Sequence, residues 1–413
     1  MKKATNRSRR SCHRSKGDVP RKPSTEQQDL LTQIVRMDNL RRSFKKVKEN
    51  RGSHGSDKIS VKMVEDSLDE TLLTLQEALM NGEYLPAPLR RVAIPKDNGK
   101  ERIISIPTVI DRIAQQAVLS TVEPLFEQVF LPCNHGFRPS LGTETAMEEV
   151  LTLIKEGYHY VIKGDITGCF DHIPKALLLQ QVKANVTDYG ALNIISKMIQ
   201  QGTAGTAEDH VEGIPQGGVI SPLLANVYLH QLDSFADTRG FRLIRYADDW
   251  VMMFRTERDA RVAREHTEAY ITHTLHLTSK DKETEQDITY ITSGFNFLGY
   301  TFYEGGRKPS DRAINRFRLT LPLKIDKALN KSDAAGTHYE RSLSNVIAAA
   351  NPFIEGWGQY YTRGNGRSIL RNLDAYIRGT IREIAAIGGR RTNHSLYQEG
   401  LFSLERLHIR NHQ

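Results

Sequence analysis

The chain has 413 residues, of which 39% are apolar, enough to bury more than one core, so we expect two or three subdomains. Its three cysteines, Cys12, Cys133 and Cys169, lie far apart and exclude a disulfide framework or a zinc-type spacing. The sequence has no apolar run that could span a bilayer and no secretory signal, so we expect a cytoplasmic protein without a membrane partner.

The formal net charge of +8 is unevenly distributed along the chain. Residues 1–22 hold nine Lys or Arg against one acid, and residues 305–413 hold eighteen against nine, which leaves residues 23–304 with nine more acids than bases. Basic ends on an acidic body are typical of a protein whose flanks bind nucleic acid. We expect the 1–22 tail to be disordered until RNA binds, and a merely solvated basic tail is the alternative.

A helix and then a loop are predicted after the tail, in an N-terminal extension that spans residues 23–75. Apolar residues recur at helical spacing between Gln27 and Lys48, and residues 50–57 are rich in glycine and serine. The apolar residues on the helical face are Leu30, Leu31, Ile34, Leu40 and Phe44.

A basic hairpin is predicted next. Residues 90–96 and 100–108 read as strands that flank the turn Asp97-Asn98-Gly99. Lys96 and Arg102 are suited to phosphate contact, and two solvated basic residues are the alternative.

Carboxylates then appear at two further strand-like places. Residues 160–166 form a β-prone run that contains Asp165, and Ala247-Asp248-Asp249 is short enough to join only adjacent antiparallel strands. Adjacent carboxylates repel each other unless a cation neutralises them, and hard oxygen ligands suit Mg²⁺. Acids from more than one strand are what two-metal nucleotidyl transfer requires. Taken singly, the alternatives are an acidic turn and an ordinary acid at a strand end.

Between these acidic segments lies the loop Gly213-Ile214-Pro215-Gln216-Gly217-Gly218. We expect Ser221 to cap the following helix, Pro222 to be its first residue, and the helix to end near Gly240. The glycine pair would let a nucleotide or a template base approach the backbone closely, and an ordinary loop is the alternative.

Taken in order, the acid strand with Phe170 five residues after Asp165, the Pro-Gln-Gly loop with its helix, and Tyr246-Ala247-Asp248-Asp249 resemble the palm of reverse transcriptases. The polymerases of bacterial group II introns are the specific resemblance. It implies that Asp165 and Asp248 bind two Mg²⁺ ions, with Mn²⁺ as a substitute, that the Ile166 carbonyl assists, and that Asp249 completes the acidic cluster. It also implies that Phe170 is a steric gate against the sugar 2′ position and that Gln216 lies against the incoming nucleotide and template.

The resemblance extends to both sides of the palm. The hairpin of residues 90–108 resembles the fingers, where Lys96 and Arg102 would carry the triphosphate, and residues 135–139 match a family segment in which Arg138 would contact the template. Gly294 to Tyr300 resembles the primer grip. The run before it departs from the family pattern, and Lys282 is the counterpart implied to lie near the leaving pyrophosphate.

Residues 351–361 resemble the group II maturase or thumb domain, although Glu355 stands where the family more often has Arg. A helix is predicted after it, with Leu370, Leu373, Ile377 and Ile381 on one face. Four arginines fall within roughly a 60° arc on another face, at about 100° per residue. A stripe that tracks a nucleic-acid backbone and a solvated surface are the two interpretations of Arg367, Arg371, Arg378 and Arg382.

The resemblance implies an α+β fold, a right-hand polymerase. Fingers and palm, with an antiparallel sheet and packed helices, would occupy residues 76–304, and an α-helical thumb or maturase-like domain residues 305–413. The implied activity is RNA-directed DNA synthesis from dNTPs on an RNA template with a DNA or RNA primer, together with intron RNA binding as a maturase. Two alternatives remain: a domesticated enzyme that copies a dedicated noncoding RNA in antiviral defence against phage, and an RNA-binding splicing factor with secondary polymerase activity. The chain ends soon after the thumb helix, so we expect no C-terminal endonuclease domain.

Overall fold

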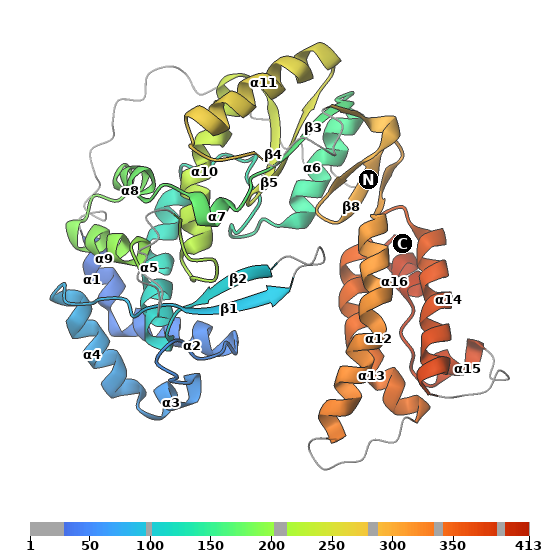
Figure 1. Cartoon of the computed structure of the whole chain (residues 1–413), viewed down its shortest axis with the longest axis horizontal. Coiled ribbons are helices and arrows are strands. Elements are labelled where there is room, and N and C mark those ends of the chain that lie inside the picture. The colour runs from blue at the N-terminus through green and yellow to red at the C-terminus, as the bar shows by residue number, and fades with distance from the viewer. Residues whose placement is uncertain are drawn as a thin grey trace, which may run out of the picture. The chain divides into compact units, whose positions relative to one another are not determined.

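The computed structural model of the protein describes residues 29–95, 101–201, 213–279, 288–333, 342–385 and 393–412. The chain divides into two compact units (Figure 1). Unit 1 comprises residues 1–146, 163–253 and 258–285, and unit 2 comprises residues 147–162, 254–257 and 286–413. The basic 1–22 tail lies outside the described residues.

Unit 1 is built mainly of helices around two strand pairs (Figure 1). Its helices are α1 Leu30–Val35, α2 Met37–Glu49, α3 Val61–Asp66, α4 Leu68–Met80, α5 Val109–Glu127, α7 Cys169–His172, α8 Lys175–Lys183, α9 Tyr189–Ile199, α10 Ser221–Thr238 and most of α11 Glu257–His273. Its strands are β1 Arg90–Pro95, β2 Glu101–Ile106, β4 Arg242–Tyr246 and most of β5 Asp249–Phe254. Helix α6 Thr143–Lys155 and strand β3 Tyr160–Asp165 run from one unit into the other.

The N-terminal extension differs from the single helix that the sequence predicts. Arg36, with φ −55° and ψ 132°, breaks it into α1 and α2. The buried Asn39 amide explains how the break is tolerated, because its Nδ2 donates to the carbonyls of Gln33 and Ile34 at the end of α1. It also donates to the Ala117 carbonyl of α5, 3.2 Å away, and so anchors the break to the core.

The predicted basic hairpin is confirmed. Strands β1 and β2 pair antiparallel from Arg90 opposite Ile106 to Pro95 opposite Glu101, and their connection lies outside the described residues. The glycine-rich loop that follows α2 is attached to this hairpin, since Arg90 donates to the Ser53 hydroxyl (2.7 Å) and to the His54 carbonyl (3.0 Å). The extension is therefore part of unit 1 and not a separate domain.

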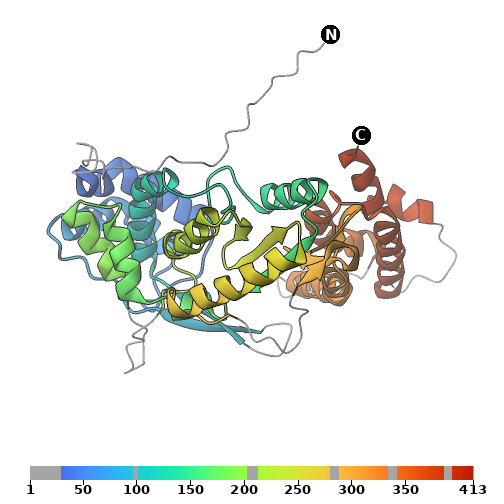
Figure 2. The ribbon, with the colours of Figure 1, turned by 90° about the horizontal axis from the view of Figure 1, so that it is seen from above.

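The central sheet has the strand order β4-β5-β3-β6, in which β6 is Thr289–Tyr290. Strand β5 is buried from Trp250 to Phe254, and Leu243 and Ile244 of β4 are buried beside it. Helices cover the sheet: α10 lies against β4, and Thr267 of α11 contacts the Met252 sulfur of β5 (Figure 2). Val251 and Met253, which point to the face opposite to Met252, are fully buried as well.

Unit 2 contains a small sheet and a helical bundle (Figure 1). The sheet orders β7 Phe295–Phe297, β8 Tyr300–Tyr303 and β9 Gly306–Pro309, after the short 3₁₀ helix η2 Ile291–Ser293. The helices are α12 Asp311–Asp333, α13 Leu343–Tyr361, α14 Arg367–Ile384, α15 Asn393–Gln398 and α16 Leu404–Asn411. The predicted apolar face of α14 is confirmed, because all four of its residues are at most 1% exposed.

The aromatic residues of the predicted primer-grip hairpin are core residues of unit 2. Tyr300 is fully buried and its ring lies 5.2 Å from that of Tyr361, which stacks on Trp357 at 4.4 Å. A Cβ on Gly299 would meet the Tyr361 hydroxyl at 2.4 Å, so only glycine fits there. The last segment of unit 2 begins at residue 286 and includes this hairpin. None of the helices in the described parts of the chain is long and apolar enough to cross a membrane.

Candidate active site

A two-residue turn joins β4 to β5 and carries the first acid of the predicted pair. Tyr246 pairs with Asp249, which leaves Ala247 and Asp248 as the turn. Ala247 has φ +57°, in the left-handed region. For an L residue this conformation costs about 1–2 kcal/mol and persists only where the surroundings hold it.

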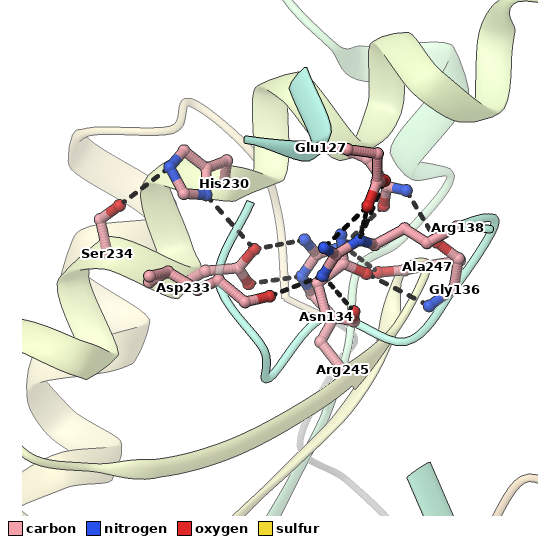
Figure 3. A network of polar contacts seen from close by, with 11 residues as sticks. Glu127, Asn134, Gly136, Arg138, His230, Asp233, Ser234, Arg245 and Ala247 are labelled. Carbon is pink, nitrogen blue, oxygen red and sulfur yellow. Dashed lines mark hydrogen bonds and ion pairs between the residues drawn. The ribbon is translucent and has the colours of Figure 1, made fainter. Parts of the chain in front are cut away.

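The surroundings of this turn are a buried polar network (Figure 3). Arg245 and Asp233 are both fully buried and form a two-point ion pair, Nε to Oδ1 at 2.6 Å and Nη2 to Oδ2 at 2.5 Å. Arg245 Nη1 donates to the Asn226 Oδ1 at 3.1 Å and to the Ala247 carbonyl at 3.0 Å. Although burial opposes it, the Arg245 guanidinium holds the pKa of Asp233 below its usual value. Both groups are therefore charged inside the protein.

Strand β3 brings Asp165 beside the turn. A Cβ on Gly164 would lie 1.9 Å from the Trp250 indole, so the glycine lets this side chain cross β3. Successive strand residues point to opposite faces, so Asp165 and Asp249 both lie on the face opposite to the Trp250 ring. The strand alternation thus directs acids from two neighbouring strands to one side of the sheet.

Asp165 and Asp248 both act electrostatically on the buried Cys169 thiol. Burial raises the pKa of this thiol, and the negative charges of Asp248, Asp165 and Asp171 raise it further. Across the described parts of the chain, no group of three or more His, Cys, Asp and Glu side chains is arranged to hold a metal ion. Two carboxylates nevertheless suit Mg²⁺, which is commonly bound by one or two carboxylates together with waters and substrate phosphates.

Phe170 and the Pro-Gln-Gly loop lie against each other through their backbones. Phe170, half-buried in α7, accepts a hydrogen bond at its carbonyl from the Ile214 N–H at 2.7 Å. The Gln216 carbonyl accepts from the Ser105 N–H of β2 at 2.8 Å, and the Val219 N–H donates to the buried Gln115 side chain at 2.7 Å. The loop therefore connects the palm to the fingers hairpin.

The structure explains why this loop contains glycine, and the explanation differs from the one that the sequence indicated. Gly217 has φ +125°, and a Cβ there would lie 2.6 Å from the Ser105 carbonyl. Its close approach is thus to the backbone of the fingers hairpin. The helix after the loop, α10, begins at Ser221 with Pro222 in its first turn and ends at Thr238, as predicted, except that Ile220 and not Ser221 is the N-cap residue.

The other predicted nucleotide contacts are only partly described. Arg102 is exposed on β2, opposite Ile94. Ile166 is buried and forms an isolated bridge with Ser279. Lys96 and Lys282 lie outside the described residues.

Arg138 has surroundings that argue against the predicted template contact. Its side chain is 8% exposed and forms a two-point ion pair with Glu127, with Nη2 to Oε2 at 2.9 Å (Figure 3). Its Nη1 donates to the carbonyls of Leu131 and Asn134. With these donors engaged inside the protein, Arg138 fixes the segment after α5, and we do not assign it to a nucleic-acid surface.

The arginines of the α14 stripe in unit 2 form more contacts within the protein than the sequence suggests. Arg367 and Arg371 are exposed and both pair with Glu405 of α16, at 3.1 and 3.0 Å. Arg378 donates to the Tyr397 hydroxyl at 2.7 Å. Arg382 is half-buried. The stripe therefore helps to join α14 to its neighbours, and Arg367 and Arg371 are its exposed part.

Sequence reasoning missed the residues that support the site. Asp233 and Asn226 lie on α10, and Gln115 lies in the middle of α5; each is at most 1% exposed. A usable signal was present for Asp233, because Leu229, Leu232 and Phe235 make its helix apolar on several sides, and a charge inside such a helix requires a buried partner.

The likeness to known proteins agrees with this geometry. The family model described as reverse transcriptase (RNA-dependent DNA polymerase) matches residues 94–302, and that of the group II intron, maturase-specific domain matches residues 333–395. The chain is 31% identical over 342 residues to Protein YkfC of Escherichia coli (strain K12), which covers 73% of this chain and 88% of that protein. It is 38% identical over 172 residues to the group II intron-encoded protein LtrA of Lactococcus lactis subsp. cremoris, covering 40% of this chain and 28% of that protein.

Two solved structures show weaker likeness. A telomerase chain from Candida albicans, in complex with a fragment of telomeric RNA, is 10% identical with a TM-score of 0.44, over 84% of this chain and 68% of that chain. A chain of a partial Cas6-RT-Cas1–Cas2 complex is 21% identical with a TM-score of 0.37, over 59% of this chain and 42% of that chain.

Proposed function

The chain belongs to the reverse transcriptase family of group II intron type, an RNA-directed DNA polymerase with a maturase-specific domain, and from this premise we propose that Asp165 and Asp248 carry its nucleotidyl transfer. The observation that supports this assignment is that β3, which ends at Asp165, lies next to β5 in the sheet, and β5 follows directly on the turn that carries Asp248. Asp249 lies on the same sheet face as Asp165 and completes the acidic cluster.

The reaction joins a primer to a nucleotide. The primer 3′ hydroxyl gives up its proton to water and its oxygen bonds to the α-phosphorus of a dNTP. The bond from that phosphorus to the bridging oxygen breaks, and pyrophosphate leaves. Divalent cations, when bound, offset the negative charge on the attacking and leaving oxygens. Asp165, Asp248 and the Ile166 carbonyl are the oxygen donors that would hold them, with Mg²⁺ as the favoured ion.

The nucleotide is held by residues around this cluster in our proposal. Exposed Arg102 carries the triphosphate together with Lys96, Lys282 lies near the pyrophosphate, and Gln216 lies against the incoming nucleotide. Phe170 excludes the 2′ hydroxyl.

The role of Phe170 predicts that Phe170→Ala admits ribonucleotides. A competition assay between dNTPs and ribonucleotides measures this selectivity, and unchanged sugar selectivity would show that Phe170 is not the steric gate.

The biological role that we propose is intron RNA binding and maturation by the same protein. The maturase-specific match over residues 333–395 supports it, because that match covers the whole of α13 and α14 and the start of α15. A dedicated noncoding RNA copied in phage defence is the second candidate. Sequencing of the RNA that co-purifies from the native locus separates them, because exon-bounded intron RNA supports the first role and one short recurrent RNA supports the second.

The decisive experiment on the site is Asp248→Ala in the full chain, with Asp237→Ala on the exposed end of α10 as the matched carboxylate control. We expect Asp248→Ala to abolish primer extension on an RNA template while RNA binding and thermal unfolding stay unchanged. The control should extend primers normally. Primer extension by Asp248→Ala would overturn the metal-ligand assignment.

A further inference from the structure

We propose that Arg245 is a positioning residue that holds the Ala247 carbonyl, and through it the turn that presents Asp248, with α10 as the fixed support. The proposal rests on the proposed role of Asp248 and adds a residue that touches neither substrate nor metal. It is carried by the contacts of the Arg245 guanidinium and by the backbone conformation of the turn.

The turn requires stabilising contacts because its backbone conformation is unfavourable by itself. Ala247 takes φ +57° without being glycine. On one side the turn contacts the backbone of Gly136, where a Cβ would lie 2.4 Å from the Ala247 N–H nitrogen. On the other side, Arg245 Nη1 donates to the Ala247 carbonyl at 3.0 Å. The peptide before Asp248 is thus confined from two directions.

The guanidinium can act as a rigid link because its donors lie in one plane. Asp233 engages Nε and Nη2 at 2.6 and 2.5 Å, which fixes the plane and leaves Nη1 directed at the Ala247 carbonyl and at the Asn226 Oδ1. A lysine ammonium is a point charge and cannot meet these acceptors in a fixed fork. The arrangement therefore depends on arginine and not on positive charge alone.

Helix α10 is the element to which the turn is tied (Figure 3). Asn226 and Asp233 are seven residues apart, which places them on one face of the helix, two turns from each other. Asn226 also donates from Nδ2 to the Gly136 carbonyl at 2.7 Å and so holds the segment that backs the turn. Helix α10 begins directly after the loop that contains Gln216. The same helix therefore connects the proposed nucleotide contact with the Asp248 turn.

The experiment compares two variants of the full chain. Arg245→Lys keeps a buried positive charge near Asp233, whereas Arg245→Met/Asp233→Leu removes both charges, a change that need not destabilise the fold. We expect kcat for primer extension to fall about 10- to 100-fold in each, because small displacements of a reacting group have effects of this size. KM for the dNTP should change far less. The Mn²⁺ affinity of the free enzyme, measured by calorimetry, should fall about tenfold or more, as when groups that orient metal ligands are lost.

The controls separate positioning from stability and from the site assignment. Arg264→Met/Glu268→Leu removes a partly buried pair on α11 and should leave kcat and Mn²⁺ affinity unchanged. If either Arg245 variant folds and keeps wild-type kcat and Mn²⁺ affinity, the positioning role is overturned. Asp248→Ala is measured in the same assay. If Asp248→Ala is inactive, an unchanged Arg245 variant overturns the positioning role alone. If Asp248→Ala is active, the assignment of the active site itself is wrong. Should the double variant not fold, Arg245→Lys decides by the same readouts.

Discussion

Arg245 in unit 1 and the arginines of α14 in unit 2 carry the same guanidinium group in opposite surroundings. Arg245 is fully buried against an equally buried Asp233, whereas Arg367 and Arg371 are 58% and 62% exposed and share Glu405 at the surface. A buried pair is intolerant of losing one member because the other charge stays unsolvated. Exposed pairs are screened by water and salt, and their contribution to stability is small. The comparison teaches that burial decides whether an arginine orders the protein or remains available to a ligand.

The largest effect should follow from breaking the buried pair on one side. Asp233→Asn leaves Arg245 charged without its carboxylate, and we expect the free energy of unfolding to fall by about 3–5 kcal/mol. Urea denaturation followed by circular dichroism measures this loss. Arg245→Met/Asp233→Leu is the matched control and should recover most of it. Equal stability of Asp233→Asn and wild type would contradict the buried charge pair.

An intermediate effect is expected on RNA binding. If Arg367 and Arg371 contact phosphates, as one of the two interpretations of the stripe predicts, Arg367→Gln/Arg371→Gln should reduce the magnitude of the slope of log K against log salt by about 1.4 for a single strand, at about 0.7 per phosphate. Filter binding of an unstructured single-stranded RNA over a salt series provides the slope. Arg245→Lys should leave the slope unchanged although it lowers kcat. An unchanged slope in the Arg367 and Arg371 variant would assign these residues to holding α16 alone.

The smallest effect concerns Glu405 and pH. Its hydrogen bond with Arg371, together with the Arg367 charge, lowers the pKa of Glu405 below 4.5, so its stabilising contribution is present above that value and is lost as pH falls through the lower folded pKa. We expect Glu405→Gln to cost less than about 1 kcal/mol at pH 7. Thermal unfolding at pH 7 and in acid should show the difference between the two proteins disappearing in acid. A stability difference that grows on acidification would contradict the lowered pKa of Glu405.

Asp374, which lies near Glu405 in unit 2, illustrates the opposite sign. Burial raises its pKa, although the N–H groups of Leu404 and Glu405 and the Ser403 hydroxyl donate to it. Asp374 therefore favours the folded state most below its unfolded pKa, and this contribution is lost as pH rises through its folded pKa. The stabilising contributions of Asp374 on α14 and Glu405 on α16 thus change with pH in opposite directions, because Asp374 is buried and Glu405 lies near the surface.

Local sequence determined much of this protein. The fingers hairpin, the β4–β5 turn, the helix after the Pro-Gln-Gly loop and the apolar face of α14 follow from residue periodicity and turn chemistry, which act over a few residues. The order of the acidic strand, the loop and the Tyr-Ala-Asp-Asp turn also indicated the family, which the family model over residues 94–302 confirms.

Only the tertiary structure decided what the charged and small residues do. Arg138 and Arg371 look alike in sequence, yet one is engaged by Glu127 and backbone carbonyls in the interior and the other lies at the surface. Gly217 approaches the Ser105 backbone, and the break at Arg36 depends on Asn39, which reaches back to α1 and across to α5. These outcomes depend on partners up to about a hundred residues away, and a local pattern carries no record of them because pairing and burial are properties of the folded chain.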